Sequence, residues 1–448
     1  MKVDSILKKM TRLPNGLNWI LLRMNVLGER LYGKNYALKL REIGTQFHES
    51  KEFVVLMNLF LSNTLFYRNQ NLTIKSFKDF QTQLPTINKT VVQNHFEAFL
   101  STNYSTENYV EGTTGGTTGK PMRIVMPKGR YGFELPVVHS FWKTFGWNFH
   151  ARGVIRNHQL NQNEEYRINP ITKEVIFDAF RQDDEYIEFV YHLLKRKNIR
   201  FIQAYPSSAY QFCKRCKELG LDLSFVTAFF TSSEPVHVFQ SSFVTKELGI
   251  PLFNFYGHSE KLMIAATCGV SEYYHFEPSY GLAELLDEND KPISEVGKRG
   301  ELTGSTFNNP GMPLLRYKTG DSAEFVGFSC PDCGKKALVV KNIIGHYNDN
   351  LVYKTIGFTT TTALNLHSEL YETIDGLQYV QEVPGKLTIC IKPNERFTLK
   401  TKERFISHFR HAMGNDSEIE LVEVRTFKSL ANGKYPLLIS QVKNESKN

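Results

Sequence analysis

Three short apolar runs in the middle of the chain constrain its fold most. They are "RFIQAY" (200–205), "FVTAFFTS" (225–232) and "PLFNFYG" (251–257), and each ends in small or turn-forming residues. Segments with a helical pattern, such as "SSAYQFCKRCKELG" (207–220), separate them. Strand, helix and strand in this rhythm predict a mostly parallel sheet covered by helices, with ligands binding beyond the carboxyl ends of the strands.

The sequence on either side of this region predicts a division into domains. Residues 1–100 carry long amphipathic runs with few glycines and are expected to be mainly helical. From about residue 345 a hairpin-like alternation precedes the helical "TKERFISHFRHAM" (401–413) and a final strand, "EIELVEVRTF" (418–427). Because 448 residues exceed what one core usually supports, we expect more than one domain. The expected fold class is α/β, with a large N-terminal domain at 1–344 and a small, mobile α+β domain at 345–448.

Composition excludes several classes of protein. The net charge of +8 is scattered, and its densest cluster, "KRK" (195–197), is expected to be a solvated helix face rather than a nucleic-acid site. The most apolar stretch, at 53–66, contains Asn58, Ser62 and Asn63, so it predicts a buried helix and no membrane span. Six cysteines and no secretion signal at the start favour reduced thiols in the cytoplasm.

A loop rich in glycine and threonine, "YVEGTTGGTTGKP" (109–121), follows the helical region. A P-loop requires a glycine five residues before Gly119 and a serine or threonine after Lys120. Thr114 and Pro121 occupy those positions, so the loop is not a P-loop. Glycine N–H groups, hydroxyls and a lysine can still wrap a phosphate, and a flexible turn is the alternative interpretation.

Three further stretches point to a nucleotide. "FFTSSEPV" (229–236) and "FNFYGHSEKLM" (253–263) place polar side chains at strand ends, and "MPLLRYKTGDSAEF" (312–325) places them in a tight turn. A tyrosine face suits a purine, one carboxylate suits ribose hydroxyls and a second suits Mg²⁺. Taken singly, each stretch is better explained as a strand-to-helix turn with an N-cap.

Together, the four stretches resemble the adenylate-forming superfamily between about residues 85 and 440. The closest group is the phenylacetate–CoA ligase-like family with its capsular-polysaccharide (CapK-like) branch. "TGGTTGKP" is similar to that family's phosphate loop, "YGHSE" to its Tyr-Gly-x-Thr/Ser-Glu motif and "RYKTGD" to its Arg-Tyr-x-Thr-Gly-Asp motif. "LANGKYPLLIS" (430–440) is similar to its closing Gly-Lys motif.

The resemblance implies a site for ATP. The phosphate loop would comprise Thr113, Thr114, Gly115, Gly116, Thr117, Thr118, Gly119 and the catalytic Lys120. The other nucleotide contacts would come from Ser233, Glu234, Tyr256, Gly257, His258, Ser259, Arg316 and Asp321, with Tyr256 near adenine and Asp321 on the ribose. Glu260 would hold Mg²⁺, and Lys434 would contact the substrate carboxylate and the α-phosphate.

The activity implied is ATP-dependent conversion of a small carboxylic acid to acyl- or aryl-AMP, with release of pyrophosphate. The acyl group would pass to an unknown acceptor (CoA, an amine or a sugar), with surface or capsular polysaccharide synthesis as one setting. The alternatives are a phenylacetate- or aryl-CoA ligase and a non-catalytic scaffold of the same fold. No nucleic acid is implied, and a homodimer is left open as an assembly.

Two departures from the family pattern bear on the acceptor. Gly115 stands where the phosphate loop usually has a serine, which removes one hydroxyl. The hinge motif usually reads Gly-Arg-x-Asp-Asp, whereas this chain has "GHYNDN" with His346 and Asn348. Loss of the arginine removes a permanent cation near the nucleotide and counts against CoA as the acceptor.

A Cys-x-x-Cys pair, Cys330 and Cys333, is followed by glycine in "FSCPDCGKK" (328–336), which is typical of a zinc knuckle. In the resembling family this pair recurs together with a Cys and a His at the positions of Cys268 and His275. A structural Cys₃His zinc site is therefore implied, and a redox pair or two unrelated buried thiols is the alternative.

Overall fold

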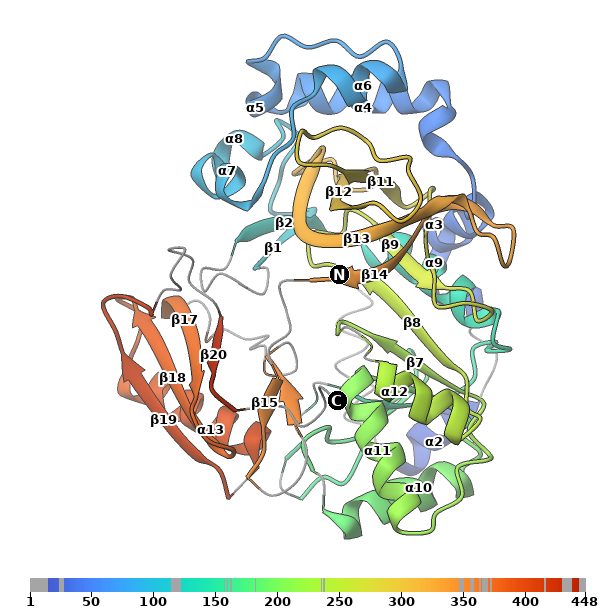
Figure 1. Cartoon of the computed structure of the whole chain (residues 1–448), viewed down its shortest axis with the longest axis vertical. Helices are drawn as coiled ribbons and strands as arrows, with labels where there is room; N and C mark the ends of the chain where they lie inside the picture. The colour runs from blue at the N-terminus through green and yellow to red at the C-terminus, as the bar shows by residue number, and fades with distance from the viewer. Residues whose placement is uncertain are drawn as a thin grey trace.

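The structure is a computed structural model, and it describes residues 15–23, 28–113, 122–345 and 350–442. Within those ranges it leaves out residues 157, 159, 162, 182, 235, 237, 355–357, 362–363, 365–369, 371–372, 415 and 429–436. Figure 1 shows the arrangement of the elements.

The described helices lie mainly in the N-terminal region and between the parallel strands. They are α2 (Asn15–Arg23), α3 (Gly28–Glu42), α4 (Lys51–Asn63), α5 (Leu65–Arg68), α6 (Phe77–Gln83), α7 (Lys89–Asn94), α8 (Phe96–Phe99), α9 (Tyr131–Lys143), α10 (Asp184–Arg196), α11 (Pro206–Glu218), α12 (Val238–Ser242) and α13 (Leu399–Met413).

The described strands form one large sheet and three small ones. They are β1 (Tyr109–Thr113), β2 (Arg123–Pro127), β3 (Arg152–Ile155), β4 (Arg167–Asn169), β5 (Glu174–Ile176), β6 (Phe201–Ala204), β7 (Ala228–Ser232), β8 (Leu252–Gly257), β9 (Ile264–Thr267), β10 (Tyr274–Phe276), β11 (Gly281–Leu286), β12 (Arg299–Thr306), β13 (Tyr317–Ser329), β14 (Lys336–Ile344), β15 (Asn350–Val352), β16 (Phe358–Thr360), β17 (Ile374–Gln381), β18 (Lys386–Pro393), β19 (Glu418–Glu423) and β20 (Leu438–Ser440).

The large sheet has 12 strands in the order β11-β12-β13-β14-β10-β9-β8-β7-β6-β3-β5-β4. Its parallel part is β5-β3-β6-β7-β8, which contains the three apolar runs that predicted it. The remaining pairs, from β8 to β11 and between β5 and β4, are antiparallel. The α/β fold is confirmed, and the sheet is more mixed than expected because short connections after β8 allow antiparallel neighbours.

Helices cover both faces of the parallel part. Phe229 of β7 belongs to a core shared with α10 and α11, whereas the next residue, Phe230, belongs to a core shared with α9. Successive side chains of a strand point to opposite faces, so this split shows that β7 is buried on both sides. α10 starts where the Asp183 side chain accepts the Tyr186 N–H, and Pro206 occupies the first turn of α11.

Helices α4, α5 and α6 form the part drawn at the top of Figure 1. The apolar stretch at 53–66 is mostly α4, which buries Phe53, Met57 and Phe60 and exposes Val55 (69%). It is therefore an amphipathic helix with one buried face, as its spacing requires. In the described part of the chain, no helix has both the length and the apolarity needed to cross a membrane.

The C-terminal part has its own core and consists of a four-stranded sheet, β19-β18-β17-β20, against α13. β17 and β18 form the expected hairpin, and α13 is the expected helix. The expected final strand, β19, is followed by β20, which pairs in parallel with β17. This smaller α+β part was correctly expected, while its boundary at residue 345 stays a prediction because residues 346–349 lie outside the described part.

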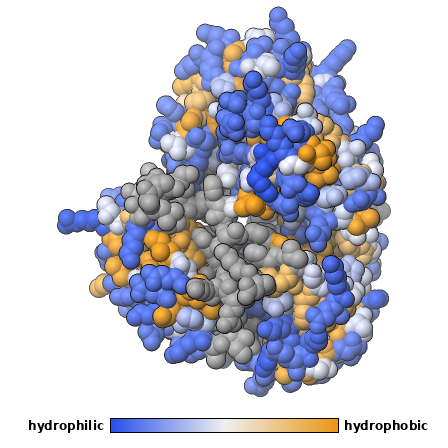
Figure 2. Space-filling view, in the orientation of Figure 1, coloured by the Kyte–Doolittle hydropathy of each residue, from blue (hydrophilic) through white to orange (hydrophobic). Residues whose placement is uncertain are grey.

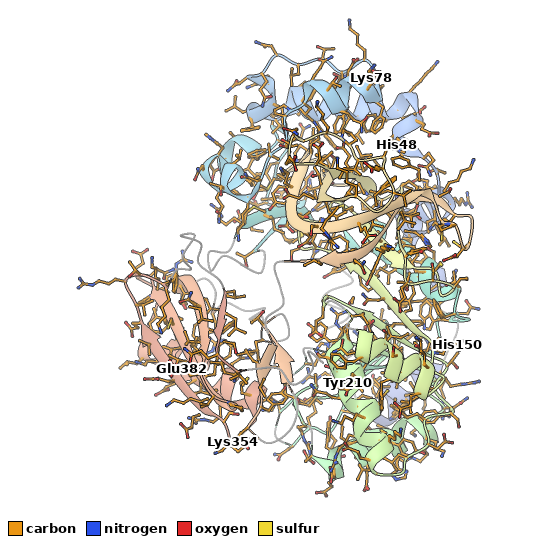
Figure 3. All side chains as sticks on the ribbon, in the orientation of Figure 1. His48, Lys78, His150, Tyr210, Lys354 and Glu382 are labelled. Carbon is orange, nitrogen blue, oxygen red and sulfur yellow. The ribbon has the colours of Figure 1, made fainter. Side chains whose placement is uncertain are left out.

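Side chains fill the interior of each part in Figure 3, where Tyr210 marks the region of α11 and Lys354 and Glu382 mark the C-terminal part. On the face shown in Figure 2, hydrophilic side chains predominate and hydrophobic ones are scattered among them.

Candidate active site

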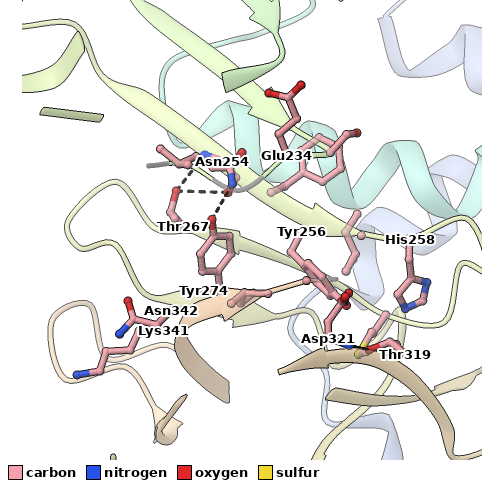
Figure 4. A pocket seen from close by; sticks show the side chains of 18 of the residues that line it. Glu234, Asn254, Tyr256, His258, Thr267, Tyr274, Thr319, Asp321, Lys341 and Asn342 are labelled. Atoms are coloured by element: carbon pink, nitrogen blue, oxygen red, sulfur yellow. Dashed lines mark hydrogen bonds between the residues drawn. The ribbon is translucent and has the colours of Figure 1, made fainter. Parts of the chain in front are cut away.

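A cavity of about 1380 Å³ lies at the carboxyl ends of the parallel strands. It is bounded by α7, β8, β9, β10 and β13 and by the turn after β7. Eight residues expected to bind the nucleotide or Mg²⁺ line it: Ser233, Glu234, Tyr256, Gly257, His258, Ser259, Glu260 and Asp321. Figure 4 shows several of them converging from different strands. The predicted strand ends therefore meet in one cavity, as expected for an α/β sheet.

Tyr256 and Asp321 are in direct contact although they lie 65 residues apart in the sequence. The Tyr256 hydroxyl donates to Asp321 Oδ2 at 2.7 Å, and the Asp321 N–H donates to the Thr319 hydroxyl at 3.1 Å. Burial, together with the Asp321 carboxylate, raises the pKa of Tyr256 well above its ordinary value, so the hydroxyl keeps its proton. A hydrogen bond to a carboxylate is among the stronger kinds, so this pair is held rigidly.

Glu260 lines the same cavity near Lys89, a residue that the sequence analysis did not single out. The Tyr317 hydroxyl donates to Glu260 Oε1 at 3.4 Å. Burial raises the pKa of Glu260, and the nearby Lys89 ammonium opposes that effect. Lys89 is the first residue of α7, whose N-cap Asn88 accepts the Val91 N–H. A carboxylate in such a setting suits a divalent cation, which would supply the charge that ionises it.

His258 contributes two buried polar atoms to the cavity wall. Within the described residues, neither ring nitrogen has a hydrogen-bond partner, and Nδ1 lies 3.7 Å from Glu260 Oε2. Burial lowers the pKa of His258 to about 4, so the ring is neutral near pH 7 and presents one donor and one acceptor. One ring nitrogen of His258 can therefore donate to a ligand in this cavity and the other can accept.

Ser233 and Glu234 lie at the end of β7 with different partners. Ser233 has a left-handed backbone (φ 71°) and accepts from Arg156 Nη2 at 3.3 Å. Glu234 Oε2 accepts the Ser207 N–H at 3.0 Å, so this carboxylate satisfies the start of α11. Both residues line the cavity, but the Glu234 side chain has a structural partner of its own.

Arg316 was expected to bind ATP, and the structure gives its guanidinium other partners. It is 3% exposed, is not one of the described residues lining the cavity, and its Nε lies 3.2 Å from Glu284 Oε2. Its Nη1 donates to the carbonyl oxygens of Gln81 and Leu84 at 2.7 Å each. Because a buried guanidinium needs such partners, Arg316 joins the N-terminal helices to β13, and its role toward ATP stays a prediction.

Most of the predicted phosphate loop, the hinge motif and the Gly-Lys motif lie outside the described residues. This holds for Thr114, Gly115, Gly116, Thr117, Thr118, Gly119 and Lys120, for Lys434, and for His346 and Asn348 of the hinge motif. Thr113 is described as the last residue of β1, which pairs with Arg123 of β2. The β1–β2 hairpin therefore presents the two ends of the predicted phosphate loop.

The predicted zinc ligands do come together. The ligand atoms of Cys268, His275, Cys330 and Cys333 all lie within 4.8 Å of one another. Gly334 (φ 73°) allows the tight turn in which its N–H donates to the Cys330 carbonyl at 2.9 Å. Burial lowers the pKa of His275 to about 4, which keeps the imidazole in the neutral form that binds metal. Three thiols and one imidazole at this spacing fit a closed tetrahedral site.

Sequence reasoning missed two cations of the cavity, Lys89 and Arg156. Arg156 follows β3 directly, and Lys89 follows the N-cap of a short helix. Their only sequence signal is a position at the end of a strand or at the start of a helix, which many surface residues share.

Over nearly its whole length the chain is similar to Protein CapK of Staphylococcus aureus. The two are 22% identical over 444 residues, which cover 94% of this chain and 96% of CapK. A shorter stretch of 149 residues is 30% identical to the phenylacetate-coenzyme A ligase of Thermus thermophilus and covers 32% of this chain and 33% of that enzyme. No family model matches the sequence.

The fold is similar to that of 2-hydroxyisobutyryl-CoA ligase in complex with 2-HIB-AMP and CoA. The TM-score is 0.50 at 13% identity, over 88% of this chain and 91% of that chain. At this identity the likeness concerns the fold alone. Together, these comparisons support the predicted resemblance of the chain to the adenylate-forming ligases, and within them to phenylacetate–CoA ligase and CapK.

Proposed function

We propose that this chain activates a small carboxylic acid with ATP, forming an acyl- or aryl-adenylate and releasing pyrophosphate. The observation that carries the proposal is the meeting of Tyr256, Asp321 and Glu260 in one cavity. An oxygen of the substrate carboxylate would form a bond to the α-phosphorus as the bond between that phosphorus and the pyrophosphate oxygen breaks. The protein's contribution is to position the reactants and to stabilise charge on the phosphates.

The eight motif residues that line the cavity each have a role in this proposal. The Tyr256 ring would stack near adenine, Asp321 would accept from ribose hydroxyls, and Ser233, Glu234, Gly257, His258 and Ser259 would line the nucleotide. Glu260 would hold Mg²⁺, which neutralises phosphate charge when bound. The loop from Thr113 to Lys120 would hold the β- and γ-phosphates, and Lys434 would approach the reacting carboxylate.

The acceptor of the acyl group is the open part of the proposal. CoA is bound in the ligase of similar fold, and phenylacetate–CoA ligase is a relative. His346 and Asn348 in the hinge motif favour an amine or a sugar instead, since they remove a cation and an acid. The similarity to CapK supports a setting in surface or capsular polysaccharide synthesis. In either case we propose that the domain at 345–448 moves between two half-reactions.

The proposal extends to the metal and to the surroundings of the enzyme. A structural zinc ion at Cys268, His275, Cys330 and Cys333 would join the end of β9 to the β13–β14 hairpin. These elements follow Glu260 and carry Asp321, so the metal would fix two parts of the ATP site relative to each other. We place the enzyme in the cytoplasm and leave a homodimer as its candidate assembly.

Pyrophosphate release from ATP with a broad panel of carboxylic acids tests the proposal. An acid that stimulates release, with loss of the effect in Glu260→Gln, is the expected result. ATP binding without release for any acid would favour the scaffold alternative. Stoichiometric consumption of added CoA would identify CoA as the acceptor.

A further inference from the structure

Arg156 presents a cation to the cavity from the end of β3. Its Nη1 and Nη2 atoms lie 3.3 Å from the Ser232 and Ser233 hydroxyl oxygens, and its guanidinium lies 5.1 Å from the centre of the Tyr205 ring. These are long contacts to neutral groups, and a guanidinium has five N–H donors. The contacts therefore hold Arg156 in place at the cavity wall and use only part of its donors.

No carboxylate among the described residues forms an ion pair with Arg156. Glu234 is the acid nearest in the sequence motif, but its Oε2 accepts the Ser207 N–H at the start of α11. A carboxylate at a helix N-terminus is stabilised there by the backbone N–H groups and the helix dipole. The Glu234 carboxylate thus caps the start of α11, and no described carboxylate forms an ion pair with the Arg156 guanidinium.

The four described lysines of the cavity differ from Arg156, since each has a carboxylate nearby; Lys89 lies near Glu260. Lys261 pairs with Glu134 at 2.6 Å, Lys318 with Asp290 at 2.8 Å and Lys341 with Glu324 at 2.8 Å. Arg156 instead contacts the hydroxyls of Ser232 and Ser233, and Ser233 also lines the cavity. A cation in a polar wall, with no ion pair to a described carboxylate, fits an anionic ligand.

We propose that Arg156 binds the second carboxylate of a dicarboxylic acid, so that the acid activated by this chain is anionic at both ends. The inference rests on the proposed function, in which the first carboxylate reacts with ATP. The planar guanidinium can donate two parallel hydrogen bonds to one carboxylate, and such charge-assisted pairs are shorter and stronger than contacts to serine.

The strand order separates Arg156 from Tyr256, although Ser233, which is also assigned to the nucleotide, contacts Arg156 directly. β6 and β7 lie between β3 and β8, so the backbones of Arg156 and Tyr256 are about 14 Å apart across the sheet. The side chain of Arg156 reaches back only as far as the end of β7. A dicarboxylic acid can bridge this space with one carboxylate at ATP and the other at Arg156.

The test is pyrophosphate release by the full chain with ATP and Mg²⁺. The probes are the straight-chain dicarboxylic acids from succinate to suberate and the monocarboxylic acids of the same lengths. We expect a dicarboxylic acid to exceed its matched monocarboxylic acid in kcat/KM by roughly 10- to 100-fold. Arg156→Gln should remove this preference by raising the KM for the acid, with the KM for ATP unchanged.

Two further variants control the result. Arg156→Lys keeps the charge without the planar fork and should retain part of the preference, and it serves the same comparison if Arg156→Gln does not fold. Arg200→Gln removes an exposed arginine outside the cavity and should change nothing. Equal use of both kinds of acid would overturn the inference. So would an Arg156→Gln variant whose KM for ATP rises with every acid, since the guanidinium would then bind a phosphate of ATP.

Calorimetry separates this inference from the proposed function. The acids are titrated into the full chain in the presence of a non-hydrolysable ATP analogue. Binding of a dicarboxylic acid that depends on Arg156, without pyrophosphate release, would contradict the proposed function and retain the anion site. Release with monocarboxylic acids, without Arg156-dependent binding of any dicarboxylic acid, would retain the function and overturn the site.

Discussion

Removing the Tyr256 hydroxyl tests whether this residue positions Asp321 for ATP. Tyr256→Phe keeps the ring that would stack near adenine and deletes the donor that lies 2.7 Å from Asp321 Oδ2. Asp321 then retains the turn around Thr319 but loses the contact that joins β13 to β8. We expect a weaker ribose contact and an intact fold.

The structure sets the size of the effect. A hydrogen bond to a charged group contributes about 1.5–3 kcal/mol. Tyr256 stays protonated because burial and Asp321 raise its pKa, so this contribution is present at any ordinary assay pH. If the contact acts on ATP through Asp321, its loss corresponds to a KM for ATP raised by roughly 10- to 150-fold.

The assay is the steady-state rate of pyrophosphate release against ATP concentration, for both single variants and the Tyr256→Phe/Asp321→Ala double variant. If Tyr256 acts through Asp321, Tyr256→Phe has no further effect in the Asp321→Ala background. Tyr274→Phe is the matched control, because its hydroxyl also lies in the cavity but accepts from Asn254 at 2.6 Å (Figure 4). Additive effects of the two substitutions would refute the positioning role.

The remaining predictions concern Lys434, the metal site and the contact between His411 of α13 and Asp178. Lys434→Ala should suppress adenylation while leaving ATP affinity nearly unchanged in a binding assay, and an unchanged rate would make that assignment wrong. Metal analysis should find close to one zinc ion per chain, reduced by Cys333→Ser; zinc-free native protein would exclude the site. His411 Nε2 lies 3.0 Å from Asp178 Oδ2. Although burial alone would raise it, hydrogen bonds from His411 and backbone N–H groups lower the pKa of Asp178. His411→Ala should lower the Tm near pH 7. The difference should shrink as the pH falls below about 4, the ordinary pKa of an aspartate, and vanish below the lowered pKa of folded Asp178. A difference that persists there would contradict this account.

The motif positions were predictable because strand ends and their turns are local in the sequence. Apolar runs that end in small residues located β6, β7 and β8, and the polar residues after them line the cavity. The spacing of Cys330 and Cys333 likewise indicated a knuckle, and the structure brings both thiols to Cys268 and His275. The parallel order of neighbouring strands makes such predictions work, since it brings the carboxyl ends together.

Partners distant in the sequence were not predictable in this way. Arg316 stands inside a nucleotide-like motif, yet Glu284 and two carbonyl groups of the N-terminal region bind its guanidinium. Glu234 likewise has a partner that its motif did not predict, because its carboxylate accepts the Ser207 N–H at the start of α11. Which partner a charged side chain takes depends on burial and on what lies within hydrogen-bond reach, and neither is a local property.

By itself, the sequence indicated the three parallel strands, the composition of the turns after them and the Cys330–Cys333 pair, because these depend on local patterns and spacing. The family resemblance, and no local pattern, implied Cys268 and His275 as further ligands. Only the tertiary structure decided that Tyr256 would bond to Asp321, that Lys89 would approach Glu260 and that Arg156 would line the cavity with no ion pair to a described carboxylate. These contacts join strands and helices from separate regions of the chain, and their geometry follows from how the sheet is ordered and packed.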